Sequence, residues 1–144
     1  MSLASLLGGL ALANAGLGVV HGFAAPLGGM FPVPHGVVCA AILPRGMEIN
    51  IRALRARSPE SEALRRYEMV ARILTGRSNA AAEDGAIHAQ QLFLDLGIPS
   101  LGTCGITQSD LPLLVQKASL ASSMRGNPIA LTLEELHEVL AGSL

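Results

Sequence analysis

Residues 18–36 read GVVHGFAAPLGGMFPVPHG and contain two histidines, His21 and His35, fourteen positions apart. On one continuous helix this spacing would separate them by about 21 Å, too far to share a ligand. Helix-breaking residues lie between them, however: Pro26, Gly28, Gly29, Pro32 and Pro34. Because Pro and Gly interrupt helices, this stretch predicts a corner that packs the end of a first helix against the start of a second.

Two imidazoles brought together in this way form the core of a possible metal site, with metal–nitrogen distances of about 2.0–2.1 Å for zinc. His35 follows Pro34 and is expected in the first turn of its helix, where the positive helix end favours the neutral, metal-binding imidazole. Two buried core histidines are the alternative. No Asp or Glu lies nearby in sequence, because Asp84, Asp95 and Asp110 fall on later helices or at their caps. The predicted metal site, His21 and His35, is therefore incomplete.

Outward from this corner the pattern is helical, without a convincing period-two strand. We expect an all-α bundle of about six helices forming one domain over residues 1–144. Three of the expected helices are residues 3–25, a helix from Pro34 with a kink at Pro44, and residues 111–120 after Thr107 and Asp110. A further helix begins at Ser58-Pro59-Glu60, has an apolar stripe of Leu64, Tyr67, Val70, Ile73 and Leu74, and ends at Gly76. The last two are a helix capped by Ser78 or Asn79 that runs through Gly97, and a helix that begins at the capping box of Thr132 and Glu135.

Composition excludes several classes of function. Of the 144 residues, 50% are hydrophobic and 15% charged, and ten Lys and Arg balance eleven Asp and Glu, so no basic surplus exists for binding nucleic acid. One Tyr, three Phe and no Trp leave little material for stacking on bases or sugars. Cys39 and Cys104 are too few for a disulfide scaffold or a Cys-based zinc site. We expect them to be buried small residues in a reducing compartment, which predicts a cytoplasmic location.

The first charged side chain is Arg45, and residues 3–25 are long and apolar enough to span a bilayer. Asn14 and His21 interrupt this segment, and no Lys or Arg flanks its start. We therefore favour a buried helix of a soluble bundle over a membrane span or a signal peptide. A segment that is apolar all round is normally enclosed by protein, either by its own chain or by a partner or missing domain.

The stretch Gly18–Gly36 resembles the metal-binding signature of the iron-containing alcohol dehydrogenases. Three later segments have the order and spacing of the closing helices of that family: Gly97-Ile98-Pro99, Ser109-Asp110-Leu111-Pro112, and Gly126-Asn127-Pro128 followed by residues 131–136. The resemblance covers the whole chain but only the C-terminal, all-helical half of the family, whose fold is dehydroquinate synthase-like. It implies a two-domain enzyme in which an N-terminal α/β domain binds NAD(P) and a helical domain binds Fe²⁺ or Zn²⁺.

The family resemblance implies one Asp and three His as metal ligands, and the last two match His21 and His35. The first two belong to an Asp-x-x-x-His helix that is expected upstream of Leu3, and neither that motif nor a Gly-rich nucleotide-binding turn is present. We therefore expect a partial metal site and a chain that is the C-terminal half of a longer enzyme. Ala25 stands where many members have a further His, a candidate proton relay. The Leu27–Phe31 run is also similar to the maleylacetate reductase branch, which leaves the substrate class open.

The implied activity is NAD(P)-dependent oxidation of an alcohol or reduction of a carbonyl, with the metal as Lewis acid and NAD(P) bound only by a full-length enzyme. Phe23, Met30 and Phe31 are candidates for the substrate side, with core packing as the alternative, and no catalytic residue is assigned. The chain alone is expected to be inactive. It is also expected to form a homo-oligomer. The alternatives are a stand-alone helical module for binding or homodimerisation, and a membrane-associated helical protein. The substrate, NAD against NADP, and iron against zinc stay open.

Overall fold

The computed structural model describes residues 2–144, and every regular element within them is helical, which confirms the predicted all-α class. There are seven α-helices and two 3₁₀ helices in that range. They are α1 (Ser2–Ala15), α2 (Val19–Met30), α3 (His35–Arg57), α4 (Glu62–Thr75), α5 (Ala82–Asp95), η1 (Gln108–Asp110), α6 (Leu111–Ser119), η2 (Ser122–Gly126) and α7 (Leu133–Ala141).

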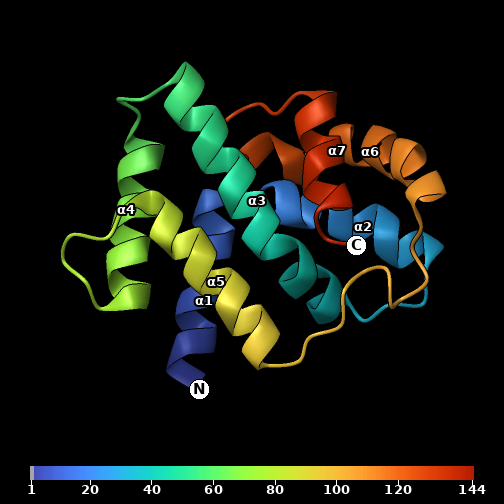
Figure 1. Cartoon of the computed structure of the whole chain (residues 1–144), viewed down its shortest axis with the longest axis horizontal. Helices are drawn as coiled ribbons and strands as arrows, with labels where there is room; N and C mark the ends of the chain where they lie inside the picture. The colour runs from blue at the N-terminus through green and yellow to red at the C-terminus, as the bar shows by residue number, and fades with distance from the viewer. Residues whose placement is uncertain (1) are drawn as a thin grey trace.

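Helix α3 crosses the middle of the molecule, with α4 and α5 on one side and α2, α6 and α7 on the other (Figure 1). Two hydrophobic clusters follow this division. The larger one joins α2, the first half of α3, α6 and α7 around side chains such as Phe23, Leu27 and Ile42, none of which is exposed. The smaller one packs Ile51 and Leu54 of α3 against α4 and α5. The long helix α3, which continues through Pro44, therefore belongs to both clusters and holds them together.

Local signals in the sequence explain several helix ends. The capping box of α7 is confirmed: the Glu135 N–H donates to Thr132 Oγ1 at 3.2 Å, and the Thr132 N–H donates to Glu135 Oε2 at 2.8 Å. Gly76 ends α4 with a φ of 69°, the left-handed conformation predicted for it. Thr107 and Asp110 begin the short helix η1, which leads directly into α6.

Two predicted helix starts are wrong. Ser58 ends α3 rather than beginning α4, and the N-cap of α4 is Ser61, whose Oγ accepts the Leu64 N–H at 3.3 Å. Ser61 is itself a good N-cap with an acidic residue directly after it, so the same signal occurs twice within four positions. Helix α5 begins after Ala81 instead of Ser78 or Asn79, because the Asp84 carboxylate accepts the Ala81 N–H and closes the first turn.

The predicted apolar stripe of α4 is only partly buried. Leu64 lies in the core, together with Ala71, but Val70, Ile73 and Leu74 are exposed. The helix has the predicted amphipathic spacing, yet only one edge of its apolar face meets another element. Helical spacing indicates which residues share a face and does not indicate whether a neighbour covers that face.

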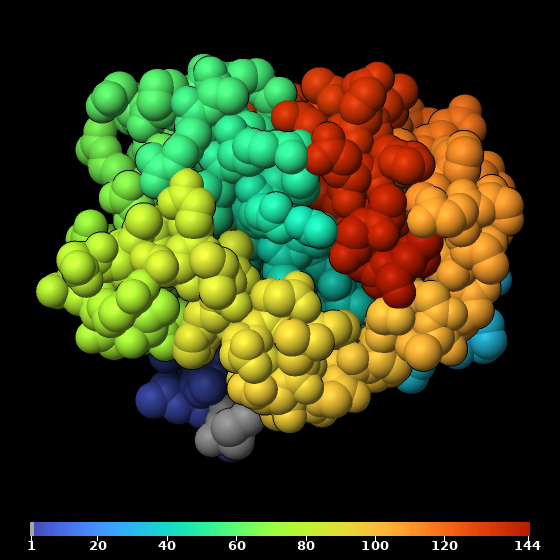
Figure 2. Space-filling model, in the orientation of Figure 1, coloured from blue at the N-terminus to red at the C-terminus, as the bar shows by residue number. Residues whose placement is uncertain are grey.

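The single helix predicted for residues 3–25 is two helices, so the structure has seven α-helices and not six. Helices α1 and α2 are bent by 99° across residues 16–18, where Gly16 adopts a φ of 73° that only Gly takes up readily. Within the described chain, the expected burial of this segment holds for α2 and not for α1. Helix α1 buries no residue, its leucines are 50–68% exposed, and in Figure 2 it emerges below α4 and α5.

The bend also bears on the membrane alternative. Within residues 2–144 no single helix is both long enough and apolar enough to cross a bilayer. Helices α1 and α2 reach the required length and composition only when they are taken together, across their bend.

Candidate metal centre

His21 lies in the first turn of α2, and the start of this helix is held by a long-range hydrogen bond. The Val19 N–H, which has no partner within the helix, donates to Asn127 Oδ1 at 2.9 Å. Asn127 in turn exchanges hydrogen bonds with the buried Asn50 of α3, at 2.7 and 3.2 Å. The turn that carries His21 is thereby tied to α3.

His35 and Cys39 lie one turn apart on α3. His35 is the first residue of the helix, as predicted, and its side chain is exposed. Cys39 follows four positions later on the same face and is half-buried. Pro34 precedes the helix with its fixed φ of −59°, which sets the direction in which the first turn begins.

The structure brings the two histidines together and adds a third donor. The ring centroids of His21 and His35 are 5.4 Å apart, with their planes inclined by 50°. Cys39 Sγ lies 3.9 Å from His21 Nε2 and 3.4 Å from His35 Nε2. One donor atom from each of the three side chains lies within 4.8 Å of the others. The predicted proximity of His21 and His35 is therefore present, whereas metal binding by them stays a prediction.

The route by which the histidines meet differs from the predicted one. Pro26, Gly28 and Gly29 lie inside α2, so among the expected helix breakers only Pro32 and Pro34 stand in the connection to α3. His21 is at the start of α2, not at the end of the first helix. Pro26 lies inside α2 and has no N–H to donate to the Gly22 carbonyl, yet the helix continues to Met30.

Burial and charge favour uncharged forms of two of these groups. Partial burial, and secondarily the neighbouring His35, lower the pKa of His21 below its ordinary value of 6.5. Burial raises the pKa of the Cys39 thiol. Neutral imidazole is the form that binds a metal ion, and imidazole and thiolate are good ligands for first-row metals. Two imidazoles and one sulfur are a donor set that fits a divalent zinc or iron ion, and the Cys39 thiol, which burial keeps protonated, would lose its proton on binding.

An open groove of about 630 Å³ lies next to the cluster, between the start of α2, α3, α4 and η2. His21 and Cys39 line it, together with Asn50, Tyr67 and Asn127. Its surface is mostly apolar with a few polar atoms, which is the usual character of a site for a small organic molecule.

Other residues that the sequence singled out lie elsewhere. Phe23 is fully buried in the larger core cluster, which agrees with the core-packing alternative for this residue; Met30 and Phe31 do not line the groove. The acidic residues have other roles: Asp84 and Asp110 accept hydrogen bonds at helix starts, and Asp95 accepts one from Gln91. Ala25 is exposed and supplies no ionisable group.

Sequence reasoning missed Cys39 and Asn127 as parts of this region. Both cysteines are free and half-buried, where we expected full burial. The spacing of His35 and Cys39 was a usable signal, since residues four apart on a predicted helix share a face. Asn127 offered no comparable signal, because its partner Val19 is 108 positions away.

Comparison with known proteins places this chain in a family. Residues 1–144 match the model of the Fe-containing alcohol dehydrogenase family, C-terminal. The chain is 38% identical over 130 residues to 1,3-propanediol dehydrogenase of Klebsiella pneumoniae, covering 89% of this chain and 32% of that protein. It is 34% identical over 145 residues to lactaldehyde reductase of Escherichia coli K12, covering 96% of this chain and 36% of that one.

A solved structure supports the same family assignment. The alcohol dehydrogenase from Oenococcus oeni superposes with a TM-score of 0.81 at 33% identity, covering 98% of this chain and 36% of that one. The chain thus spans about a third of the length of the relatives it matches. The match along the full chain and the shared helical fold together show that this protein belongs to the Fe-containing alcohol dehydrogenase family and corresponds to the C-terminal part of its members.

Proposed function

We propose that this chain is the metal-binding part of an NAD(P)-linked alcohol dehydrogenase or carbonyl reductase, with His21 and His35 as metal ligands. The observation that carries the proposal is the meeting of these two imidazoles from different helices, with ring centroids 5.4 Å apart. Family membership supports it, because the family is defined as Fe-containing. The small-molecule substrate would be an alcohol or carbonyl compound, the class to which the names of the two relatives point.

A bound Fe²⁺ or Zn²⁺ would supply Lewis-acid polarisation of the substrate oxygen during hydride transfer. The residues of this chain would hold and orient that ion. His21 offers a neutral imidazole because burial lowers its pKa. Asn127 fixes the start of α2 and so the position of His21, and the groove beside the cluster offers room for a small substrate.

Metal titration of the purified chain tests this proposal. We expect about one equivalent of Zn²⁺ to bind, and His21→Ala or His35→Ala to weaken binding at least about tenfold, since each removes a ligand. His137→Ala, a change at an exposed histidine of α7, is the matched control and should leave the affinity unchanged. Unchanged affinity in both site variants would show that the pair is not a metal site.

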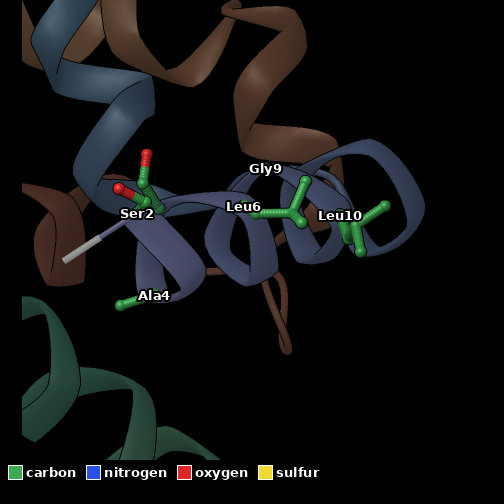
Figure 3. Close-up of a pocket in the computed structure, with 6 residues that line it drawn as sticks. Ser2, Ala4, Leu6, Gly9 and Leu10 are labelled. Atoms are coloured by element: carbon green, nitrogen blue, oxygen red, sulfur yellow. The ribbon is translucent and has the colours of Figure 1, made fainter.

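A second candidate function, a helical module that assembles with a copy of itself, is favoured by the exposure of α1. A surface pocket is lined by Ser2, Ala4, Ser5, Leu6, Gly9 and Leu10, all from this one helix, and Figure 3 shows this part of α1 in close-up. Pairing of two such helices would bury their leucines, at roughly 25 cal/mol per Å². We expect Leu6→Glu combined with Leu10→Glu to shift a homodimer to monomer in sedimentation experiments, while Leu133→Glu, an exposed leucine on α7, does not.

The two candidates are compatible, since they involve different parts of the chain, α1 for assembly and the start of α2 with α3 for the metal. Metal binding that depends on His21 and His35 supports the enzymatic candidate, whereas self-association without metal binding supports the module alone. The two free cysteines support a cytoplasmic location, where thiols stay reduced. Retention of a fluorescent fusion in the cytoplasm would test that location directly.

A further inference from the structure

We propose that Cys39 is a third protein ligand, so that His21, His35 and Cys39 form a His₂Cys site within this chain. This inference rests on the proposed metal binding by the two histidines and goes beyond it. The sequence and the family resemblance pointed only to His21 and His35 and left the site short of ligands. The structure places the Cys39 sulfur between them, at 3.9 and 3.4 Å from their Nε2 atoms.

These distances match what a tetrahedral ion requires. With metal–sulfur and metal–nitrogen bonds of about 2.3 and 2.05 Å, two ligand atoms at the tetrahedral angle lie about 3.6 Å apart. The two sulfur–nitrogen distances fall on either side of that value. All three donor atoms lie within 4.8 Å of one another, so small side-chain rotations suffice to surround one ion.

The three ligands are carried by rigid elements. His35 and Cys39 are fixed relative to each other by one turn of α3, and His21 is fixed by the first turn of α2. Helices α2 and α3 pack through fully buried side chains, including Phe23, Val38 and Ile42. A site built on packed helices holds its donors in place before the metal arrives, which favours affinity.

The ligand set also determines the class of metal. Thiolate is a soft ligand that favours Zn²⁺ and Co²⁺ over Mg²⁺ or Mn²⁺. Two imidazoles and one thiolate would supply three protein ligands, the number usual in catalytic zinc sites, to which water, a substrate oxygen or the Asp and His implied upstream by the family resemblance would be added. On binding, the Cys39 thiol would release its proton to solvent and the sulfur would bind the metal.

The competing explanation is a plain hydrogen bond between the thiol and His35 Nε2, because 3.4 Å is also within hydrogen-bonding range for sulfur. The two explanations differ in one observable. Only a metal-bound thiolate gives a sulfur-to-metal charge-transfer absorption when a coloured ion such as Co²⁺ occupies the site. A hydrogen-bonded thiol next to a two-histidine metal site gives none.

The test is Co²⁺ titration of the full chain under reducing conditions, followed in the near ultraviolet and the visible. We expect a charge-transfer band that saturates at one equivalent. Cys39→Ser should abolish the band and weaken Co²⁺ and Zn²⁺ binding at least about tenfold. Cys104→Ser, which changes the other free cysteine outside the cluster, should retain both the band and the affinity.

A second measurement leaves Cys39 intact and so does not depend on the folding of a site variant. In the Cys104→Ser background Cys39 is the one remaining thiol, and we expect saturating Zn²⁺ to slow its alkylation. The third ligand would be overturned if the wild-type protein showed no charge-transfer band and Cys39→Ser bound Co²⁺ with the same affinity as wild type. If His21→Ala and His35→Ala lost binding in the same experiment, the two-histidine site would still stand. No binding by any form would overturn both.

Discussion

Asn127 connects three separate segments through one side chain. Its Oδ1 accepts the Val19 N–H and the Asn50 amide, and its Nδ2 donates to Asn50 Oδ1 and to the Ile129 carbonyl. Asn50 is only 3% exposed, so its amide has no water to replace a lost partner. The residue therefore stabilises the turn that presents His21 as well as the fold around it.

We expect Asn127→Ala to lower the free energy of unfolding by about 2–3 kcal/mol, because it removes the partner of the Val19 N–H and of Asn50 Oδ1, while Asn50 Nδ2 keeps the Tyr67 hydroxyl as its acceptor. Urea denaturation measures this loss. Asn79→Ala, at an exposed turn between α4 and α5, is the control and should change stability by less than about 0.5 kcal/mol. Equal effects of the two substitutions would show that the network contributes no net stability.

Two glycines with different surroundings should respond in opposite ways to alanine. A Cβ on Gly126 would lie 2.2 Å from the Leu17 carbonyl oxygen, a backbone atom that cannot move aside. A Cβ on Gly28, inside α2, would meet nothing within 4 Å. We expect Gly126→Ala to destabilise by about 1–3 kcal/mol and Gly28→Ala to stabilise by about 0.5–1 kcal/mol. Thermal unfolding of both variants checks the signs, and a neutral Gly126→Ala would contradict the close approach.

Among the helices, α7 shows how one carboxylate joins two elements. Glu135 closes the capping box of α7 and also accepts hydrogen bonds from Arg57 at the end of α3, at 2.9 and 3.1 Å. Burial by itself would raise the pKa of Glu135, but the hydrogen bonds from Arg57 and from the Thr132 N–H outweigh it and lower that pKa. The ionised form is thus favoured in the folded chain.

A lowered pKa in the folded state means that the carboxylate stabilises the protein above its ordinary pKa of 4.5, and that this contribution is lost as the pH falls through the lower, folded value. We expect Glu135→Gln to cost about 1–2 kcal/mol at pH 7. The difference from wild type should shrink towards zero below pH 4.5. Urea denaturation across this pH range measures it. Glu60→Gln, at an exposed turn, is the control, and a pH-independent cost for Glu135→Gln would contradict the assignment.

At the scale of the whole molecule, the described residues form helices only. Residues 2–144 contain no strand, and dinucleotide-binding folds are built on a parallel sheet. We expect the purified 144-residue chain to show no NAD(P)-linked turnover of 1,3-propanediol or lactaldehyde, even when it is loaded with metal. Absorbance of the reduced nicotinamide measures this, with metal content of the same sample as the control. Robust turnover would contradict the expectation.

The sequence was sufficient to predict the helical class, several helix ends and the proximity of His21 and His35. Helical periodicity, the Thr132 capping box and Gly76 depend on interactions within a few residues, so they can be recognised from local sequence. The duplicated start signal at Ser58 and Ser61 could not be resolved locally, because either serine can cap a helix. The bend at Gly16 was missed because the apolar pattern continues across it.

By itself, then, the sequence determined the helical class and several helix ends, since these follow from backbone propensity and local capping, and it indicated that His21 and His35 lie close together. Only the tertiary structure decided that α1 stays exposed, that Phe23 is core, and that the Cys39 sulfur lies between His21 and His35. The physical reason is that burial and donor convergence depend on contacts between segments distant in the chain. Spacing along one helix places a residue on a face, and the packing of other helices determines what that face meets.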